Sequence, residues 1–61
     1  MPIVNIKIIE GRTLEQKREL VKSVTEAISR SIEVDPEKIW IEIDEIKKEH
    51  FSIQGTLVVD K

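Results

Sequence analysis

The sequence contains no cysteine and no tyrosine, and His50 is its only histidine. Disulfides and thiolate metal sites are therefore excluded, and one histidine cannot form a zinc site by itself. A nucleophilic triad is not expected either, because the serines have no partnered base. Aromatic side chains make up only 3% of the chain and are limited to Trp40 and Phe51.

Long hydrophobic runs and blocks of basic residues are also missing. The longest apolar runs, residues 39–41 and 57–59, are far shorter than the roughly 18 residues of a membrane span. Ten basic and twelve acidic residues give a net charge of −2, which argues against a nucleic-acid or anionic-membrane partner. The first residues lack the regions of a secretion signal, so we expect a cytoplasmic protein.

The length allows one domain, residues 1–61. A chain of this size buries only about 60% of the surface that its unfolded form exposes, and such small domains usually need a covalent staple, a metal or a partner subunit. Since cysteine is absent, self-association is the stabiliser that we expect.

Hydrophobic periodicity predicts a strand followed by a helix. Residues 3–9 alternate, with Val4, Ile6 and Ile8 on one face. Thr13 and Gln16 have the spacing of a capping box, which predicts that a helix begins there. The helix should run for about five turns, with a stripe formed by Leu14, Lys17, Leu20, Val21, Val24, Ala27, Ile28 and Ile32.

Asp35 and Pro36 should end this helix and begin a short helical turn. A second alternating segment, residues 39–46, predicts another strand, and a turn at Gly55 predicts a short hairpin in the C-terminal residues 47–61. A strand, a helix and a strand with short connections form a β-α-β unit whose strands are parallel. The predicted class is therefore α+β, with one β-α-β unit and a hairpin.

One helix can cover only one face of a two-stranded sheet. The other face would carry Ile3 and Ile9, together with Trp40 and Ile46. Leaving such side chains in water forfeits about 1.5 to 3 kcal/mol for each one that could be buried. We therefore expect a closed oligomer and an active site at a subunit boundary.

Pro2 is the residue with the most unusual chemistry. It follows Met1 and directly precedes the first predicted strand. Removal of Met1 would leave a secondary amine at the end of a rigid element, which is a well-placed base. If Met1 is retained, the Pro2 nitrogen is an amide and has no basic lone pair.

Five segments together resemble the 4-oxalocrotonate tautomerase family, also called the 2-hydroxymuconate tautomerases. They are Pro2, the turn 10–12, the helix start 15–17, the stretch 25–31 and the pair 50–51. The resemblance covers nearly the whole chain. It implies an isomerase that moves a proton between the enol oxygen and a carbon of a small dienol or enol acid, without a metal or an organic cofactor.

The resemblance also implies residue roles and an assembly. Pro2 would be the general base and then the acid, and Arg12 would bind a substrate carboxylate and draw electrons. Ile9, Phe51 and Ile53 would supply apolar surface to the substrate site. The assembly would be a homo-oligomer, a hexamer built from dimers, although a dimer also satisfies the sequence.

One position departs from the family pattern. The best-known members carry a second arginine in the second strand, and an alignment without gaps places Trp40 there. Tryptophan has one N–H donor and no charge, so it cannot replace a bidentate guanidinium. We expect weaker binding of a dicarboxylate, or a different 2-hydroxydienoate or enol-pyruvate that stacks on the indole. Residues 51–54 contain no carboxylate to activate water, which favours tautomerisation over hydration.

A second hypothesis keeps the fold without the reaction. Arg12 can be a solvated residue beside the helix start, Phe51 can be interface core, and Trp40 can pack between subunits. The chain would then be a catalytically silent oligomeric binding or scaffold protein.

Overall fold

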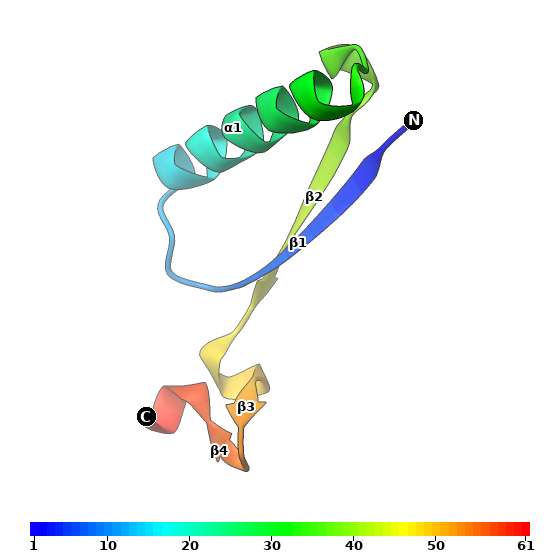
Figure 1. Cartoon of the computed structure of the whole chain (residues 1–61). Helices are drawn as coiled ribbons and strands as arrows, with labels where there is room; N and C mark the ends of the chain where they lie inside the picture. Colours follow the sequence, from blue (N-terminus) through cyan, green and yellow to red (C-terminus); the bar gives the residue numbers. More distant parts are fainter.

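The computed structural model describes all residues, 1–61. It consists of a β-α-β unit followed by a small hairpin, as Figure 1 shows. The elements in chain order are β1 (Ile3–Ile9), α1 (Leu14–Ile32), the 3-10 turn η1 (Pro36–Lys38), β2 (Trp40–Ile46), the 3-10 turn η2 (Lys48–His50), β3 (Ser52–Ile53), β4 (Thr56–Leu57) and the 3-10 turn η3 (Val58–Asp60). The predicted α+β class, with two parallel strands and a C-terminal hairpin, is confirmed.

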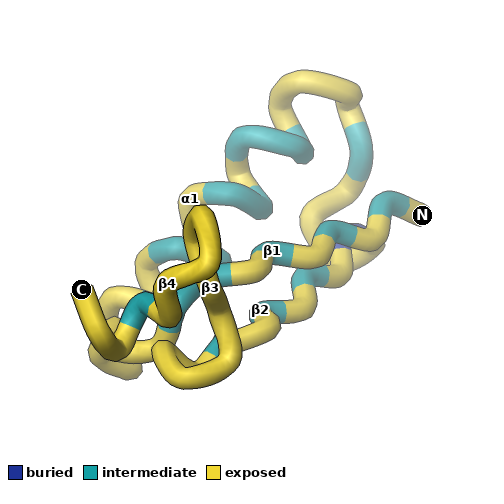
Figure 2. The backbone as a smooth tube through the Cα atoms, turned by 90° about the horizontal axis from the view of Figure 1, so that it is seen from below, coloured by how far each residue is buried: buried dark blue, intermediate teal, exposed yellow.

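The two long strands form a parallel sheet that α1 covers on one face. The register runs from Ile3 opposite Trp40 to Ile9 opposite Ile46. Exposure alternates along both strands as the sequence predicts, and the residues beneath the helix are half-buried (Figure 2). Apart from half-buried Ile9 and Ile46 at its far end, the opposite face of the sheet is open to solvent.

Helix α1 begins where the capping box predicts. The Gln16 backbone N–H donates to Thr13 Oγ1 at 3.1 Å, and the Thr13 N–H donates to Gln16 Oε1 at 2.9 Å. The helix ends before Asp35, at Ile32, where Glu33 is a left-handed C-cap whose N–H donates to the Ser29 carbonyl. Asp35 begins the helical turn as expected, because its carboxylate accepts the Glu37 N–H at 3.0 Å and caps η1. No helix combines the length and apolar character that crossing a bilayer requires.

The predicted apolar stripe of α1 is half-buried except at its two ends. Leu14 and Ile32 stay exposed. The physical reason is length: a helix of 19 residues extends about 28 Å, whereas a strand of 7 residues extends about 23 Å. The ends of the stripe therefore reach beyond the sheet and are free to contact another molecule.

The C-terminal hairpin pairs Ser52 with Leu57 and Ile53 with Thr56. Its turn residues, Gln54 and Gly55, both have positive φ, 52° and 84°, as a tight hairpin requires. The apolar run after Leu57 does not continue as a strand. The Val58 N–H donates to the Phe51 carbonyl at 2.8 Å, which adds one more ladder bond to the hairpin, and the chain then turns into η3.

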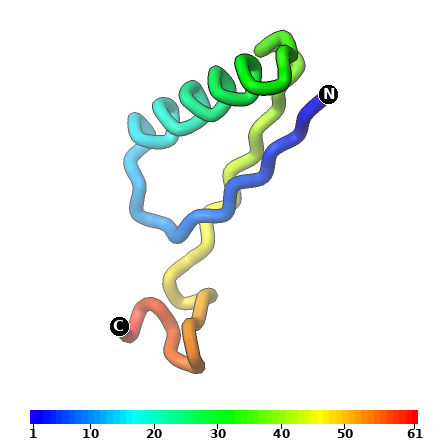
Figure 3. Tube along the Cα trace, viewed as in Figure 1, coloured from blue at the N-terminus to red at the C-terminus, as the bar shows by residue number.

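A single chain buries almost no hydrophobic core. Only Ile39 is buried, at 8% exposure, and the chain exposes 4973 Å². A folded monomer of 7.1 kDa exposes about 4,100 Å². The radius of gyration is 14.6 Å, against about 10.5 Å for a compact domain of this length. The elongated trace in Figure 3 makes the reason visible, because the hairpin lies beyond the end of the sheet.

The exposed large apolar side chains occur in every part of the chain. They are Met1, Ile3, Leu14, Ile32, Trp40, Phe51, Ile53, Leu57 and Val59. A soluble monomer rarely leaves so much apolar surface contiguous with a solvent-facing sheet. The shape and the exposure together support the predicted self-association.

We expect the stability of the fold to depend on protein concentration. Because association adds the burial that one chain lacks, the midpoint of urea unfolding should rise as total protein is raised from low micromolar to high micromolar. Sedimentation equilibrium at the same concentrations should give a mass that is a multiple of the chain mass. A monomer whose unfolding midpoint is the same at all concentrations would contradict this expectation.

Candidate active site

Pro2 lies at the beginning of the sheet, beside the start of β2. It is half-buried, and its carbonyl accepts the Trp40 backbone N–H at 3.1 Å. Ile3 and Trp40 are register partners and expose 70% and 55% of their surface. Ile3 and Trp40 therefore form an open apolar pair on the uncovered face at this strand end, while alternation puts Pro2 on the helix-covered side.

Arg12 lies at the other end of β1, in the loop that leads into α1. The loop is fixed on both sides: the Glu10 N–H donates to the Ile46 carbonyl at 2.9 Å, and the Glu10 carboxylate accepts the Lys48 N–H at 3.2 Å. Gly11 lies between Glu10 and Arg12 and has a φ of 124°, which side-chain-bearing residues rarely adopt. This backbone turn places Arg12 at the mouth of a surface groove.

The groove beside Arg12 has a volume of about 230 Å³. Its lining residues are Ile8, Arg12, Gln16, Lys17 and Leu20. It offers the Arg12 cation next to an apolar wall, a combination suited to an organic acid, while the Lys17 ammonium is paired with Glu45. Pro2 does not line it.

The remaining predicted site residues divide between the two ends of the sheet. Ile9 is half-buried at the Arg12 end, while Phe51 and Ile53 are exposed in the tail beyond that end. Only Trp40 accompanies Pro2 in the same chain. The seven residues of β1, which extend about 23 Å, lie between Pro2 and the loop that carries Arg12.

A small acid cannot touch Pro2 and Arg12 of one chain at the same time. A site that uses both residues therefore requires Arg12, or Pro2, from a neighbouring chain. This geometry agrees with the expectation, drawn from the sequence, that the active site lies at a subunit boundary.

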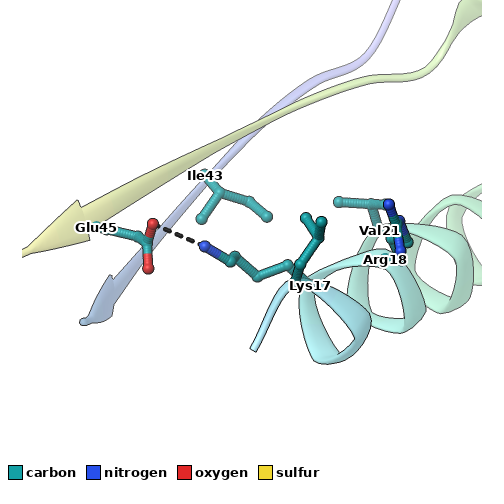
Figure 4. Close-up of a pocket in the computed structure, with 6 residues that line it drawn as sticks. Lys17, Arg18, Val21, Ile43 and Glu45 are labelled. Carbon is teal, nitrogen blue, oxygen red and sulfur yellow. Dashed lines mark hydrogen bonds and ion pairs between the residues drawn. The ribbon is translucent and has the colours of Figure 1, made fainter. Parts of the chain in front are cut away.

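A second groove, between α1 and β2, contains an ion pair that the sequence analysis missed. The Lys17 ammonium lies 2.8 Å from the Glu45 carboxylate, as the close-up in Figure 4 shows. The groove has a volume of about 350 Å³, and its other lining residues are Leu14, Arg18, Val21 and Ile43.

Two patterns in the sequence could have predicted this ion pair. Lys17 is the only polar residue in the predicted stripe of α1, and the alternation of Ile41 and Ile43 continues to Glu45 on the same face of β2. Both side chains remain partly exposed, so the pair stabilises the fold by at most about 1 kcal/mol. We assign it a role in docking the helix onto the sheet. No three His, Cys, Asp or Glu side chains gather as they would around a metal ion.

Comparison with known proteins decides which family uses this arrangement. The profile of the family described as "Tautomerase enzyme" matches residues 2–61. The chain belongs to the tautomerase family. This result confirms the resemblance that the five sequence segments indicated.

Individual tautomerases are similar over the full length. The chain is 46% identical over 61 residues to a probable tautomerase of Halalkalibacterium halodurans, with 100% of both chains covered. It is 45% identical over 60 residues to the 2-hydroxymuconate tautomerase of Bacillus subtilis, covering 98% of this chain and 97% of the relative. A heterohexameric 4-oxalocrotonate tautomerase of Chloroflexus aurantiacus superimposes with a TM-score of 0.92 at 27% identity, covering 98% of this chain and 97% of that one.

Membership in the tautomerase family supports an isomerase rather than a catalytically silent scaffold. The parallel sheet, the covering helix and the hairpin are the fold of these relatives.

The backbone at Gly11 generates a first test of the site. A Cβ placed there would meet no atom within 4 Å, so any penalty comes from the φ of 124° alone. Gly11→Ala should lower the free energy of unfolding by about 1 to 3 kcal/mol, measured by urea titration at fixed protein concentration. Gly55→Asn is the control, because asparagine tolerates a left-handed φ and should change stability by less than about 0.5 kcal/mol. Equal losses in both variants would contradict the assignment.

Proposed function

We propose that the mature chain is a cofactor-independent tautomerase in which Pro2 is the general base and then the general acid. The position of Pro2 carries the proposal: it is half-buried at the first rung of a rigid sheet, in a family of tautomerases. With Met1 in place, the Pro2 nitrogen is an amide. The proposal therefore requires that Met1 be removed, which turns this nitrogen into a basic secondary amine.

The reaction rearranges bonds without any co-reactant. The Pro2 nitrogen takes the proton from the enol O–H, the oxygen forms a C=O bond, and the carbon–carbon double-bond electrons move along the chain of the substrate. The protonated amine then returns a proton to carbon. Atoms and electrons balance, so neither a metal nor an organic cofactor is needed. Such positioned proton transfer contributes about 10² to 10⁴ in rate.

The environment should tune the basicity of Pro2. A chain-terminal amine has a reference pKa of about 8 and is only about 10% neutral at pH 7. Burial beneath a neighbouring subunit, with apolar contacts from Ile9, Phe51 and Ile53, disfavours the charged amine, and so does the positive charge of Arg12. We therefore expect the pKa of Pro2 to lie below the reference value, which leaves more of the base neutral.

Arg12 would supply the electrophilic half of the site. Its guanidinium can bind a substrate carboxylate through two parallel hydrogen bonds and stabilise the charge that moves toward it. Since the length of β1, about 23 Å, lies between Pro2 and the Arg12 loop of one chain, the arginine would come from another chain of the assembly.

The assembly that fits this requirement is a homo-oligomer, a hexamer built as a trimer of dimers. The heterohexameric relative from C. aurantiacus supports that number. A dimer would meet the same requirement if it brought one Pro2 next to the partner's arginine. The 2-hydroxymuconate tautomerase of B. subtilis supports a 2-hydroxydienoate or a related enol-pyruvate as substrate.

Replacing Pro2 tests the proposal directly. Pro2→Ala should lower kcat for ketonisation of 2-hydroxymuconate or phenylenolpyruvate by about 10² to 10⁴, because the positioned secondary amine is lost. The reaction is followed by absorbance, and intact mass establishes that Met1 is absent from the samples compared.

The matched control is the unsubstituted chain with Met1 retained, which should be as inactive as the variant. NMR titration of the Pro2 nitrogen in the processed protein should give a pKa below about 8. Equal rates for wild type and Pro2→Ala, with an unshifted amine, would instead favour a scaffold that has the fold without the reaction.

Arg12 is tested against a second arginine of the same helix region. Arg12→Ala should raise KM at least about 10-fold and lower kcat, because a charge-assisted contact to the substrate carboxylate disappears. Arg18→Ala removes an exposed side chain that pairs only with Glu15 and should leave both constants within about 2-fold. If the two variants behave alike, Arg12 does not bind the substrate.

A further inference from the structure

The side-chain amide of Gln16 lies beside Arg12 and keeps two hydrogen-bond donors free. Both residues line the same groove of about 230 Å³. Gln16 Oε1 accepts the Thr13 N–H at 2.9 Å. Because only the oxygen of a side-chain amide can accept an N–H, this bond fixes which end of the amide is turned toward Thr13. The Nε2 group of Gln16 donates to no group of the chain, so its two N–H bonds are available to a ligand.

Arg12 is also free of a protein partner, unlike the other cations at the beginning of α1. The Lys17 ammonium lines the same groove but lies 2.8 Å from the Glu45 carboxylate, and Figure 4 shows it reaching across to β2. Arg18 pairs with Glu15. Arg12 forms no ion pair. The groove therefore combines one unpaired guanidinium with one unpaired amide NH2 group.

These two groups are complementary to a single carboxylate. A carboxylate has about four acceptor positions on its two oxygens, and a guanidinium fills two of them with parallel N–H bonds. An amide NH2 group can fill a third position without adding charge. The amide oxygen would repel the anion, but in Gln16 this oxygen is already occupied by Thr13.

We propose that Gln16 is a second carboxylate-binding residue of the groove, which acts together with Arg12. Arg12 supplies the charge, and Gln16 Nε2 supplies a directed N–H bond. This inference rests on the proposed role of Arg12 in binding the substrate. The capping box then has two roles, because the bond that fixes the first turn of α1 also orients the donor.

Gln16→Glu separates binding from capping. Glutamate also completes a capping box, so the midpoint of urea unfolding at fixed protein concentration should stay close to that of the wild type. The substitution replaces the N–H donor by a negative charge that repels the substrate carboxylate and pairs with Arg12. KM for 2-hydroxymuconate should therefore rise about 10- to 100-fold.

Lys22→Gln is the matched control for charge. It makes the chain more negative by the same amount as Gln16→Glu, at an exposed position of α1 that lines neither groove. It should leave KM within about 2-fold. A rise in KM that is equal in the two variants would mean that net charge alone is responsible, which overturns the inference.

A binding measurement tests the same contact without turnover. Adipate, a dicarboxylate that has no enol, is titrated into protein labelled with ¹⁵N and followed by NMR. The chain has only three side-chain amides, those of Asn5, Gln16 and Gln54, so their NH2 signals can be assigned one by one. The Gln16 signals should shift most, in a saturable way, and the shift should be lost in Arg12→Ala.

The inference is overturned if Gln16→Glu keeps both the stability and the KM of the wild type, or if the Gln16 amide signals do not respond to adipate. If Gln16→Glu fails to fold, the NMR titration of the unsubstituted protein decides. Failure of the proposed function looks different: Pro2→Ala would keep its turnover, or Arg12→Ala would bind adipate as tightly as the wild type.

Discussion

Burial of the sheet is the constraint on which the rest of the molecule depends. One amphipathic helix covers one side of a two-stranded sheet, and the capping box at Thr13 and Gln16 fixes where that helix begins. The chain has no second helix for the other side and no disulfide to compensate. Because apolar side chains at both ends of α1, on the sheet and in the hairpin remain exposed, the fold is complete only when copies of the chain cover one another.

The small number of secondary-structure elements also explains where the candidate site residues lie. Strand β1 acts as a rigid spacer, with a potential base, Pro2, directly before its first residue and the Arg12 guanidinium in the loop after its last. The Glu10 contacts to Ile46 and Lys48 hold the arginine loop, the sheet and the tail in one arrangement. In the proposed site, association would therefore have two effects at once, since it would cover the sheet and bring the two kinds of group together from different chains.

The sequence predicted most of the fold, because periodicity and capping are local signals. The alternation of Val4, Ile6 and Ile8 and the left-handed turn at Gly55 needed no distant information. The end of the hairpin was less predictable, because the apolar run 57–59 leaves the strand after Leu57 and enters η3. The family resemblance named the site residues, but residue types alone could not show that β1 holds Pro2 and Arg12 apart or that Lys17 reaches Glu45.

The length of β1 has a consequence for how the enzyme is controlled by its own abundance. In the proposed site, a chain that has lost Met1 would carry both the base and the arginine but no complete catalytic centre, so it would be inactive until it associates with its neighbours. Turnover per chain should then climb more steeply than abundance near the dissociation threshold and level off above it. Dilution alone would then abolish the activity by dissociating the chains, without any ligand or covalent change.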